Sequence, residues 1–563
     1  MAARVAKQNA LFEEYFETGL KNAPERATSV GDYRYNALLS DASLAAIRRQ
    51  HAENDTFLKR LRAISTDGMP ETDRLSHEIL ERQLVRADVN YELKNYEMPI
   101  NQQNGVHTGL ADLPLSVPFD SVKHYEDYIA RLHQIPRVLT QTEEVLRAGV
   151  KDSLMPPKLV VNQLPEQCEG IVKEDPFLLP LKKFPASFSD ADKQRLTAGM
   201  TKAVNEDVLP AYKKFAGFLR TEYVPKGRTA ISIESLPDGK RRYAEAVKAM
   251  TTIDITPEAV HNLGLSEVKR ITAEMTDLAH AQGYKDLAAF RAAIKNDPKW
   301  TPKSEEQIVA DFKKYIDQMQ PRLPELFGLL PKAPVTVEAI PSFQAAAATH
   351  YVRGTPDGKR AGRVVVAVAD PTHRTLVLDE AVAYHEGVPG HHLQISIAQQ
   401  LTGLPKFRVL GGFFSAYTEG WALYAEQLGK EIGFYKDPVS DYGRLSSELF
   451  RAVRLVVDTG IHDKGWSRDQ VISYMRENDV NDVLAQSETD RYIAWPGQAL
   501  AYKMGQLKIR ELRDRAQKAL GSRFDIKTFH DEILDGGAMP LDLLEARVNG
   551  WIKAQGGQKA AGR

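Results

Sequence analysis

The chain has 563 residues, with 74 lysines and arginines against 75 aspartates and glutamates. The formal net charge of -1, spread without a basic stripe, argues against a nucleic-acid partner. The single cysteine, Cys168, excludes an intrachain disulfide and a thiolate metal cluster, so histidine and carboxylate side chains must hold any transition metal. A chain of this length exceeds one ordinary hydrophobic core, and we expect two or more packed lobes.

No apolar run reaches the length needed to cross a bilayer, about 18 residues, and we predict no membrane span. The first residues, MAARVAKQNALFEEYF, lack the apolar stretch of a secretory signal, which favours a cytoplasmic location. A mature protein trimmed of its leader looks the same, so a periplasmic location stays comparably open. The oligomeric state is not predicted.

Most of the sequence predicts helices, because apolar residues recur at intervals of three and four. The helical pattern covers 8–22, 41–64, 73–96, 122–149, 190–223, 257–281, 305–328, 376–387, 391–402, 414–432, 440–462, 467–477 and 497–520. The prolines between 154 and 187 exclude a long helix there, and we expect this segment to cross the surface between helical layers.

Strand signals are few and clustered. Residues 335–340 alternate between apolar and polar, and 363–368 form a β-branched run. A turn signal, Pro356-Asp357-Gly358, lies between them, and 229–233 is a weaker strand candidate. We therefore predict a mainly α fold with one small β-sheet beside the helix that carries His385.

We divide the predicted fold into two parts. An N-terminal helical lobe covers 1–250, and a C-terminal catalytic lobe covers 251–563. Both parts are expected to belong to one continuous fold.

The segment His385-Glu386-Gly387-Val388-Pro389-Gly390-His391-His392 is related to the HExxH motif of zinc peptidases. In that motif two histidines one helical turn apart bind zinc, and the glutamate acts as general base. Here the next histidines follow His385 by six and seven residues. On an ideal helix His391 would lie roughly 120° off the face of His385, and His392 would lie roughly 10 Å further along.

The residues between the histidines suggest how the spacing is resolved. Pro389 disfavours a helical conformation at Val388, and Gly387 and Gly390 permit unusual backbone angles. Looping out two residues would return His391 to the place of the fourth residue after His385. We therefore predict a bulge at Gly387–Gly390 and His391 as the ligand, with His392 as the alternative.

A third ligand is available in Glu419, on an otherwise apolar and aromatic helix where a carboxylate is costly to bury without a partner. Glu426 lies two turns later on the same face and is either the hydrogen-bond partner of a ligating histidine or part of a surface salt bridge. The alternative for the three histidines is that they are ordinary polar side chains around a kinked turn, and for Glu419 that it is a solvated helix residue. Three histidines and a glutamate within eight residues, followed by Glu419, favour the metal site.

The motifs HEGVPGHHLQ, TEGWALYAE and RYIAWPGQALAYKMG, with GDYRY near the start, resemble the bacterial family called domain of unknown function 885. That family in turn is similar to the helical glutamate-zincins carboxypeptidase Taq, thimet oligopeptidase and angiotensin-converting enzyme. The resemblance implies a two-lobed helical shell around a deep cleft, with peptide added at the edge of the small sheet. It also implies that His385, His391 and Glu419 bind zinc and that Glu386 is the general base and acid.

The sequence departs from those relatives at two points. Two extra residues separate His385 from His391, and Leu423 stands where several relatives have an acidic residue. Glu426 would have to take the place of that acid. His392 is then expected near the ligands but not on the metal.

The remaining chemistry needs a donor for the oxyanion and a group for the substrate. Arg491-Tyr492 resembles an Arg-Tyr pair of angiotensin-converting enzyme, which makes Tyr492 the expected donor. Arg491 or Lys503 is expected to pair with a substrate carboxylate, with Tyr502 beside them. Tyr351 is expected to line the cleft from the sheet side. The alternative for the tyrosines is core packing with a satisfied hydroxyl.

Together these residues predict a zinc-dependent metallopeptidase that hydrolyses short peptides with metal-activated water. A zinc hydrolase of a non-peptide amide or ester would use the same site. A protein that binds a peptide or small molecule and keeps a relict metal site is the alternative from another class, although it has no need for Glu386.

Overall fold

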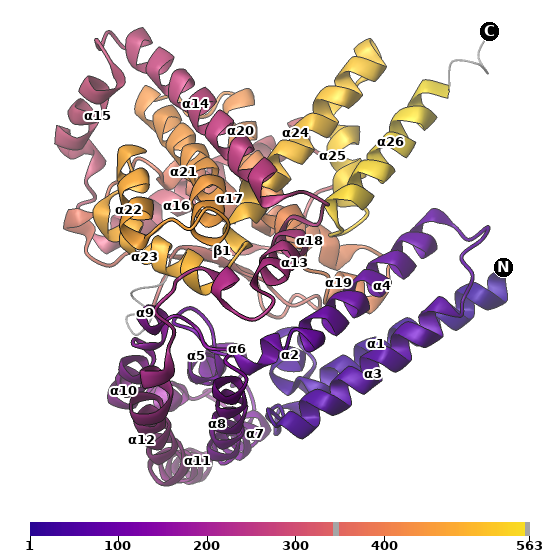
Figure 1. The fold of residues 1–563 in the computed structure, drawn as a ribbon, viewed down its shortest axis with the longest axis vertical. Coiled ribbons are helices and arrows are strands. Elements are labelled where there is room, and N and C mark those ends of the chain that lie inside the picture. Colours follow the sequence, from indigo (N-terminus) through magenta and orange to yellow (C-terminus); the bar gives the residue numbers. More distant parts are fainter. Residues whose placement is uncertain (342–347, 558–563) are drawn as a thin grey trace. The chain divides into compact units, whose positions relative to one another are not determined.

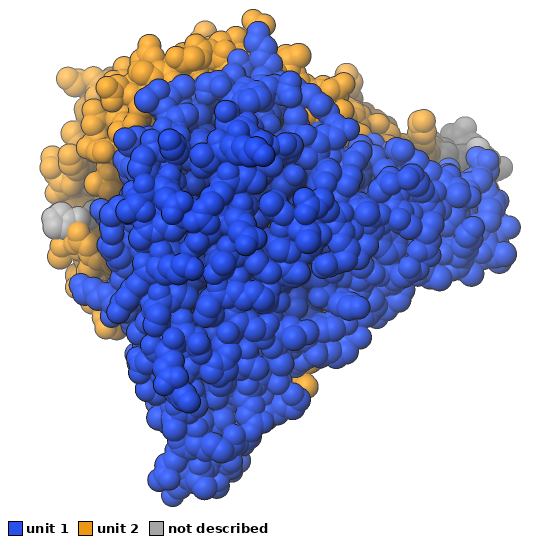
Figure 2. Space-filling model, turned by 60° about the horizontal axis from the view of Figure 1, so that its bottom comes forward, with its two compact units in different colours: residues 1–242, 405–407 blue, residues 243–404, 408–563 orange. Residues whose placement is uncertain are grey.

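The computed structural model describes residues 1–341 and 348–557, shown as a ribbon in Figure 1. As predicted, the described chain is mainly α-helical, with one small three-stranded sheet. It forms two compact units, coloured separately in Figure 2: Met1–Arg242 with Pro405–Phe407, and Tyr243–Leu404 with Arg408–Arg563. We call them unit 1 and unit 2.

Unit 1 is helical throughout its described length. Its helices are α1 (Ala2–Asn22), α2 (Pro24–Ser29), α3 (Leu44–Arg62), α4 (Glu71–Glu92), α5 (Val106–Ala111), α6 (Leu113–Ser116), α7 (Val122–Leu132), α8 (Ile135–Lys151), α9 (Lys158–Val161), α10 (Leu164–Glu174), α11 (Asp190–Ala203) and α12 (Leu209–Phe218). Its core is rich in aromatic residues, among them the fully buried Tyr125, Tyr128 and Tyr212.

Two predictions for unit 1 are wrong. The segment 154–187 does not cross the surface, because Cys168 and Phe177 within it are fully buried. Two of its prolines, Pro165 in α10 and Pro176 in the 3-10 helix that follows, stand in the first turn of a helix, where a missing N–H costs nothing. The predicted strand 229–233 is also absent: Pro157 and Arg228 form only an isolated bridge.

Unit 2 contains the sheet and most of the longer helices. The boundary between the units falls within α13 (Gly239–Thr251), and α19 (Lys406–Val409) also has residues of both. The remaining helices are α14 (Pro257–Ala281), α15 (Leu287–Asn296), α16 (Glu305–Met319), α17 (Asp379–Glu386), α18 (His391–Gln400), α20 (Ser415–Glu431), α21 (Pro438–His462), α22 (Arg468–Glu477), α23 (Asp482–Ala494), α24 (Ala501–Leu520), α25 (Ile526–Leu534) and α26 (Leu541–Gly557). None of the described helices is long and apolar enough to cross a membrane.

The sheet of unit 2 contains both predicted strands. β1 (Val335–Ala339) runs parallel to β3 (Gly362–Val366), and β2 (His350–Val352) pairs antiparallel with β3, in the order β1-β3-β2. The sequence did not predict β2, which is too short to show an alternating pattern. The predicted turn lies between β2 and β3, with Gly358 at a positive φ of 73°.

The long helices of unit 2 pack closely on one another. In unit 2, α14 lies along α21 and α20 lies along α24 (Figure 1). On α20, Trp421 is fully buried and its indole N–H donates to the Pro389 carbonyl, 2.9 Å away. This bond ties the segment between α17 and α18 to α20.

Candidate metal centre

The predicted bulge is present as a complete break between two helices. Helix α17 ends at Glu386 and α18 begins at His391. The Gly390 N–H donates to the carbonyl of Tyr384 at 2.9 Å, six residues back, where an α-helix reaches back four. This hydrogen bond therefore closes a turn that is two residues longer than a helical turn. The distance along the chain from His385 to His391 exceeds that in the HExxH motif by the same two residues.

Glycine is needed at the end of this break. A Cβ on Gly390 would overlap with the backbone carbonyl oxygens of His385 and Tyr384. The peptide bond between Val388 and Pro389 is cis. The chain thus turns tightly against the last turn of α17, and His391 comes back beside His385.

Three side chains converge at this break. The imidazole rings of His385 and His391 lie with their centroids 4.8 Å apart, at 85° to each other. The Oε2 atom of Glu419 lies 3.5 Å from Nε2 of His385 and 3.3 Å from Nε2 of His391. In the described part of the chain, these three residues form the one group of ligand-type side chains that converges closely enough to hold a metal ion.

The spacing of these atoms fits a metal ion better than direct hydrogen bonds. Zinc bonds of 2.0–2.1 Å in tetrahedral geometry place neighbouring ligand atoms about 3.4 Å apart. A hydrogen bond between an imidazolium and a carboxylate is shorter, about 2.7–2.9 Å. Both measured separations, 3.5 and 3.3 Å, match the first value. Two imidazoles and a carboxylate are also the donor set that suits zinc.

Glu426 orients the first ligand. Its Oε1 atom lies 2.8 Å from Nδ1 of His385, and only 1% of Glu426 is exposed. The Tyr435 hydroxyl donates to the backbone carbonyl of Glu426 at 2.9 Å. Because Nδ1 donates this bond, Nε2 is the ring nitrogen that remains for a metal ion beside Glu419. Leu423, one turn before Glu426, is a buried apolar residue. The carboxylate beside His385 therefore comes from Glu426.

The electrostatics of the cluster favour a cation. Burial opposes a charge on His385, but the neighbouring carboxylates of Glu419 and Glu426 outweigh it and raise the pKa of His385 to about 10. Burial likewise opposes a charge on Glu419, yet the two histidines hold its pKa well below the usual range. Without a metal, the carboxylates therefore retain a proton on His385, and a divalent ion would take the place of that positive charge.

Glu386 lies beside the cluster without being one of its three converging groups. Its Oε2 atom is 3.9 Å from Nε2 of His391, and 8% of the residue is exposed. Among the described residues, no side chain donates a hydrogen bond to this carboxylate. It is therefore available to accept a proton from a molecule bound at the cluster.

His392 points away from the cluster, toward the sheet. Its Nε2–H donates to the Ala333 carbonyl at 3.1 Å, and its Nδ1 accepts from the Tyr351 hydroxyl at 3.1 Å. Burial lowers its pKa to about 4, so the ring is neutral. His392 therefore does not contact the cluster, and the Tyr351 hydroxyl, expected at the substrate, is instead hydrogen-bonded to this ring.

Two further residues do not fit the roles expected for them. The Tyr492 hydroxyl donates to Glu488 at 2.6 Å and accepts from Nε of Arg454 at 2.9 Å, and 1% of the residue is exposed. Because the hydroxyl hydrogen of Tyr492 is donated to Glu488, it is not free for the oxyanion of a substrate. Lys503 is fully buried, with its ammonium 2.6 Å from Glu448 and 2.9 Å from Glu267, so it holds helices together and cannot bind a substrate carboxylate.

Tyr502 is the tyrosine at the cluster. Its ring stacks near that of His385, with centroids 6.4 Å apart and planes at 21°. Its hydroxyl oxygen accepts from Nη2 of Arg491 at 3.3 Å and from the Gln498 amide at 3.5 Å. No described residue accepts the hydroxyl hydrogen. The resemblance pointed to Tyr492 on α23. Only the packing of α24 shows that Tyr502 is the tyrosine beside His385.

Arg454 and Glu488 are residues of this region that the sequence did not single out. They form an ion pair of 3.0 Å behind Tyr502, and the Arg454 guanidinium lies 4.6 Å over the Tyr502 ring. Both belong to long amphipathic stretches with many other charges, so the sequence offers no signal for them.

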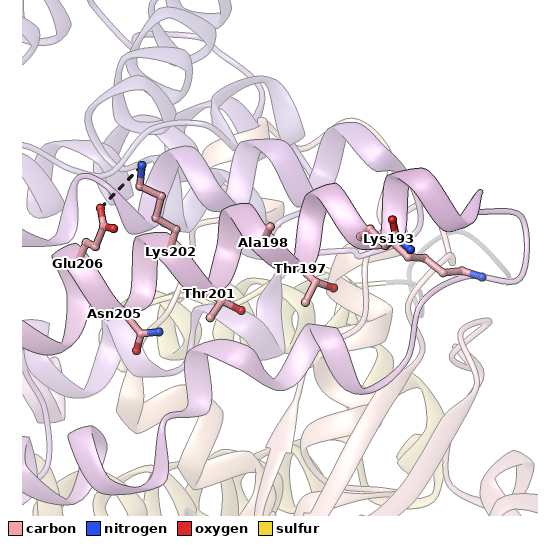
Figure 3. Close-up of a pocket in the computed structure, with 8 residues that line it drawn as sticks. Lys193, Thr197, Ala198, Thr201, Lys202, Asn205 and Glu206 are labelled. Carbon is pink, nitrogen blue, oxygen red and sulfur yellow. Dashed lines mark ion pairs between the residues drawn. The ribbon is translucent and has the colours of Figure 1, made fainter.

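A separate open hollow lies in unit 1, along one face of α11 and the turn that follows it. Figure 3 shows that its lining side chains come from a single helical segment, with Lys202 paired to Glu206 at 3.9 Å. None of the predicted site residues lines it. Because its lining comes from one face of one helical segment, this hollow does not bring side chains from different elements together, and we assign no site to it.

Comparison with known proteins identifies relatives over the whole chain. A structure of a "putative lipoprotein" from Colwellia psychrerythraea is 29% identical, with a TM-score of 0.92, over 98% of this chain and 99% of that one. A second one, from Shewanella oneidensis, is 18% identical with a TM-score of 0.72 over 96% and 99% of the chains, and shows likeness of fold alone. A search of curated proteins found no match. The family model described as "bacterial protein of unknown function (DUF885)" matches residues 24–548, so the chain belongs to the DUF885 family.

Proposed function

We propose that this protein is a zinc-dependent metallopeptidase that hydrolyses short peptides. The observation that carries the proposal is that one oxygen of Glu419 faces Nε2 of both His385 and His391 at the separations of zinc ligands. A carboxylate without a hydrogen-bond donor, Glu386, lies next to them. The order of the motifs supports a distant relationship to the helical glutamate-zincins as part of the same proposal.

The chain's own residues would divide the reaction between them. A bound zinc ion would supply a Lewis acid and make water a nucleophile at neutral pH. Glu386 accepts a proton from the water whose oxygen adds to the scissile carbonyl carbon, and delivers it to the leaving amine as the C–N bond breaks. Tyr502 donates its free hydroxyl hydrogen to the oxyanion that develops on the carbonyl. We thereby assign to Tyr502 the role that the sequence gave to Tyr492.

Metal analysis of purified variants tests the site. We expect about one zinc per chain in the wild type, loss of zinc in His385→Ala, and retained zinc without hydrolysis in Glu386→Gln. Glu431→Gln is the matched control for a lost carboxylate, because Glu431 lies at the end of α20 and pairs with Arg513 at 2.8 Å. Undiminished zinc in His385→Ala, or an active Glu386→Gln enzyme, would contradict the proposal.

A substrate panel distinguishes the proposed peptidase from the other functions. Short peptides and small non-peptide amides and esters are offered to the zinc-loaded protein, with a chelator-treated sample as the blank. Hydrolysis of the amides or esters alone would identify a different zinc hydrolase. Tight binding of peptides without turnover would identify a binding protein.

The location of the protein is also proposed from its relatives. Both structural neighbours carry the name "putative lipoprotein" and match nearly the whole chain. We infer that the protein works outside the cytoplasm. Fractionation of cells expressing the natural gene tests this, and recovery with the cytoplasmic fraction would refute it.

A further inference from the structure

Two guanidinium groups near the cluster, the buried one of Arg454 and the half-buried one of Arg491, share a single carboxylate. Glu488 pairs with Arg454 at 3.0 Å and with Arg491 at 3.1 Å. No other carboxylate in the described chain forms an ion pair with either arginine. Because arginine stays charged in proteins, the group carries one excess positive charge.

The protein compensates this excess charge incompletely, because one nitrogen of the Arg454 guanidinium has no hydrogen-bond acceptor in the described chain. Only 5% of Arg454 is exposed, and its Nη1 is buried without a hydrogen-bond partner in the described chain. A buried charge without a counterion is costly, so an anion that approaches this group would gain free energy. Arg491 is the member that such an anion can reach, because 18% of its side chain is exposed.

The excess charge lies directly behind the candidate metal centre. Arg454 stacks over the Tyr502 ring, and Arg491 donates to the Tyr502 hydroxyl. Tyr502 in turn stacks beside His385, with 6.4 Å between ring centroids.

We propose that Arg491, supported by Arg454, binds the free C-terminal carboxylate of a peptide whose scissile bond lies at the candidate metal centre. This inference rests on the proposed peptidase function and names its substrate class: short peptides with an unblocked C-terminus. The fork of a guanidinium matches a carboxylate with two parallel hydrogen bonds. Lys503, the other cation expected at the substrate, has Glu448 and Glu267 as its own partners.

Binding to the inactive Glu386→Gln protein tests the proposal without turnover. Calorimetry compares acetyl-Ala-Ala-Ala, its C-terminal amide, and the amide of acetyl-Ala-Ala-Glu, which carries a carboxylate only on its side chain. We expect the free acid to bind about tenfold or more tightly than either amide, a difference of about 1.4 kcal/mol or more. Equal affinities for the free acid and its amide would overturn the proposal. Tight binding of the glutamate amide would overturn the C-terminus as the source of the carboxylate.

Variants of Arg491 separate binding from a structural role. Arg491→Gln should remove the preference for the free acid and leave binding of the amide unchanged, and Arg491→Lys should restore part of the preference. The control is Arg468→Gln, which removes the same charge from a residue paired with Asp490 at 2.7 Å. A preference that survives Arg491→Gln would refute the assignment.

Turnover by the wild-type protein distinguishes failure of the carboxylate site at Arg491 from failure of the proposed peptidase function. A zinc enzyme that cleaves free acids and amides equally well is a peptidase without this carboxylate site. A protein that binds no zinc and cleaves neither peptide refutes the proposed function itself.

Discussion

Gly420 on α20 and Gly505 on α24 pack against each other through their backbones. A Cβ on Gly420 would overlap with Cα of Gly505, and a Cβ on Gly505 would overlap with the carbonyl oxygen of Ala416. The residue before Gly420 is the candidate ligand Glu419, and Tyr502 lies one turn before Gly505. The close approach of the two helices therefore brings a metal ligand and the proposed oxyanion donor to the same place.

Gly505→Ala is expected to weaken both the fold and the metal site. The added methyl group has no free space, and such overpacking costs typically about 1–3 kcal/mol. We expect a lower thermal midpoint and a lower zinc content. Gly550→Ala is the control, because Gly550 lies in α26 with nothing near its Cβ position, and alanine there should stabilise the helix by about 0.5–1 kcal/mol. An unchanged midpoint for Gly505→Ala would mean that the helices can separate at no cost.

Glu426→Gln is expected to lower zinc affinity by about 10- to 100-fold. The amide oxygen can still accept the hydrogen bond from His385, but it no longer carries the charge that makes the ring a stronger ligand. Competition with a chelator of known affinity measures the change. Glu431→Gln, on the same helix, should leave the affinity unchanged, and an equal loss in both variants would show a general effect of charge.

Tyr502→Phe is expected to lower kcat by about 100-fold or more, because it removes a hydroxyl hydrogen beside the cluster that no described residue accepts. Tyr492→Phe should lower kcat less than tenfold, which corresponds to a rise in the activation free energy of less than about 1.4 kcal/mol. Its main effect should be a lower thermal midpoint. The reason is that the Tyr492 hydroxyl bonds only to Glu488 and Arg454. Steady-state kinetics on one peptide measures both, and the reverse order of effects would return the role to Tyr492.

Asp379→Asn is expected to change how stability depends on pH. Burial, opposed by Arg374, raises the pKa of Asp379 from 3.8 to about 6. The folded protein therefore holds a proton that the unfolded chain releases, and the stability from this group is present below about pH 4 and lost as pH rises through about 6. Asparagine cannot lose a proton, so the variant should gain about 2–3 kcal/mol relative to wild type over this range.

Urea unfolding of the metal-free protein at pH 4.5 and 7.5 measures this difference. Asp482→Asn is the control, because Arg476 lowers the pKa of the exposed Asp482 below its usual value of 3.8, so this carboxyl is ionised in the folded and the unfolded chain at both pH values. The stability of that variant relative to wild type should therefore be the same at pH 4.5 and 7.5. A constant difference between Asp379→Asn and wild type at both pH values would contradict the ionisation of Asp379.

The local features of the metal centre were predictable because they depend on residues close in sequence. Pro389 and the two glycines indicated the break after Glu386, and helical periodicity placed Glu419 and Glu426 on one face of α20. The same residues favoured His391 as the neighbour of His385 and left His392 as the alternative, which the break between α17 and α18 excludes.

The surroundings of the centre were not predictable, because they depend on which helices meet. The sequence favoured Tyr492 as the oxyanion donor, through the resemblance, and only the crossing of α20 and α24 sets Tyr502 beside His385. The burial of Lys503 follows from Glu448 and Glu267 on two other helices, which no local pattern connects. Strand β2 was missed because three residues are too few for a pattern.

The break between α17 and α18 affects how such sites can be found. Once a helix stops at its first ligand and starts again at its second, the number of residues between the ligands describes the connecting turn and not the metal. A search that fixes this number finds only chains with an uninterrupted helix. A search for two imidazoles that meet one carboxylate, whatever separates them along the chain, would find both kinds.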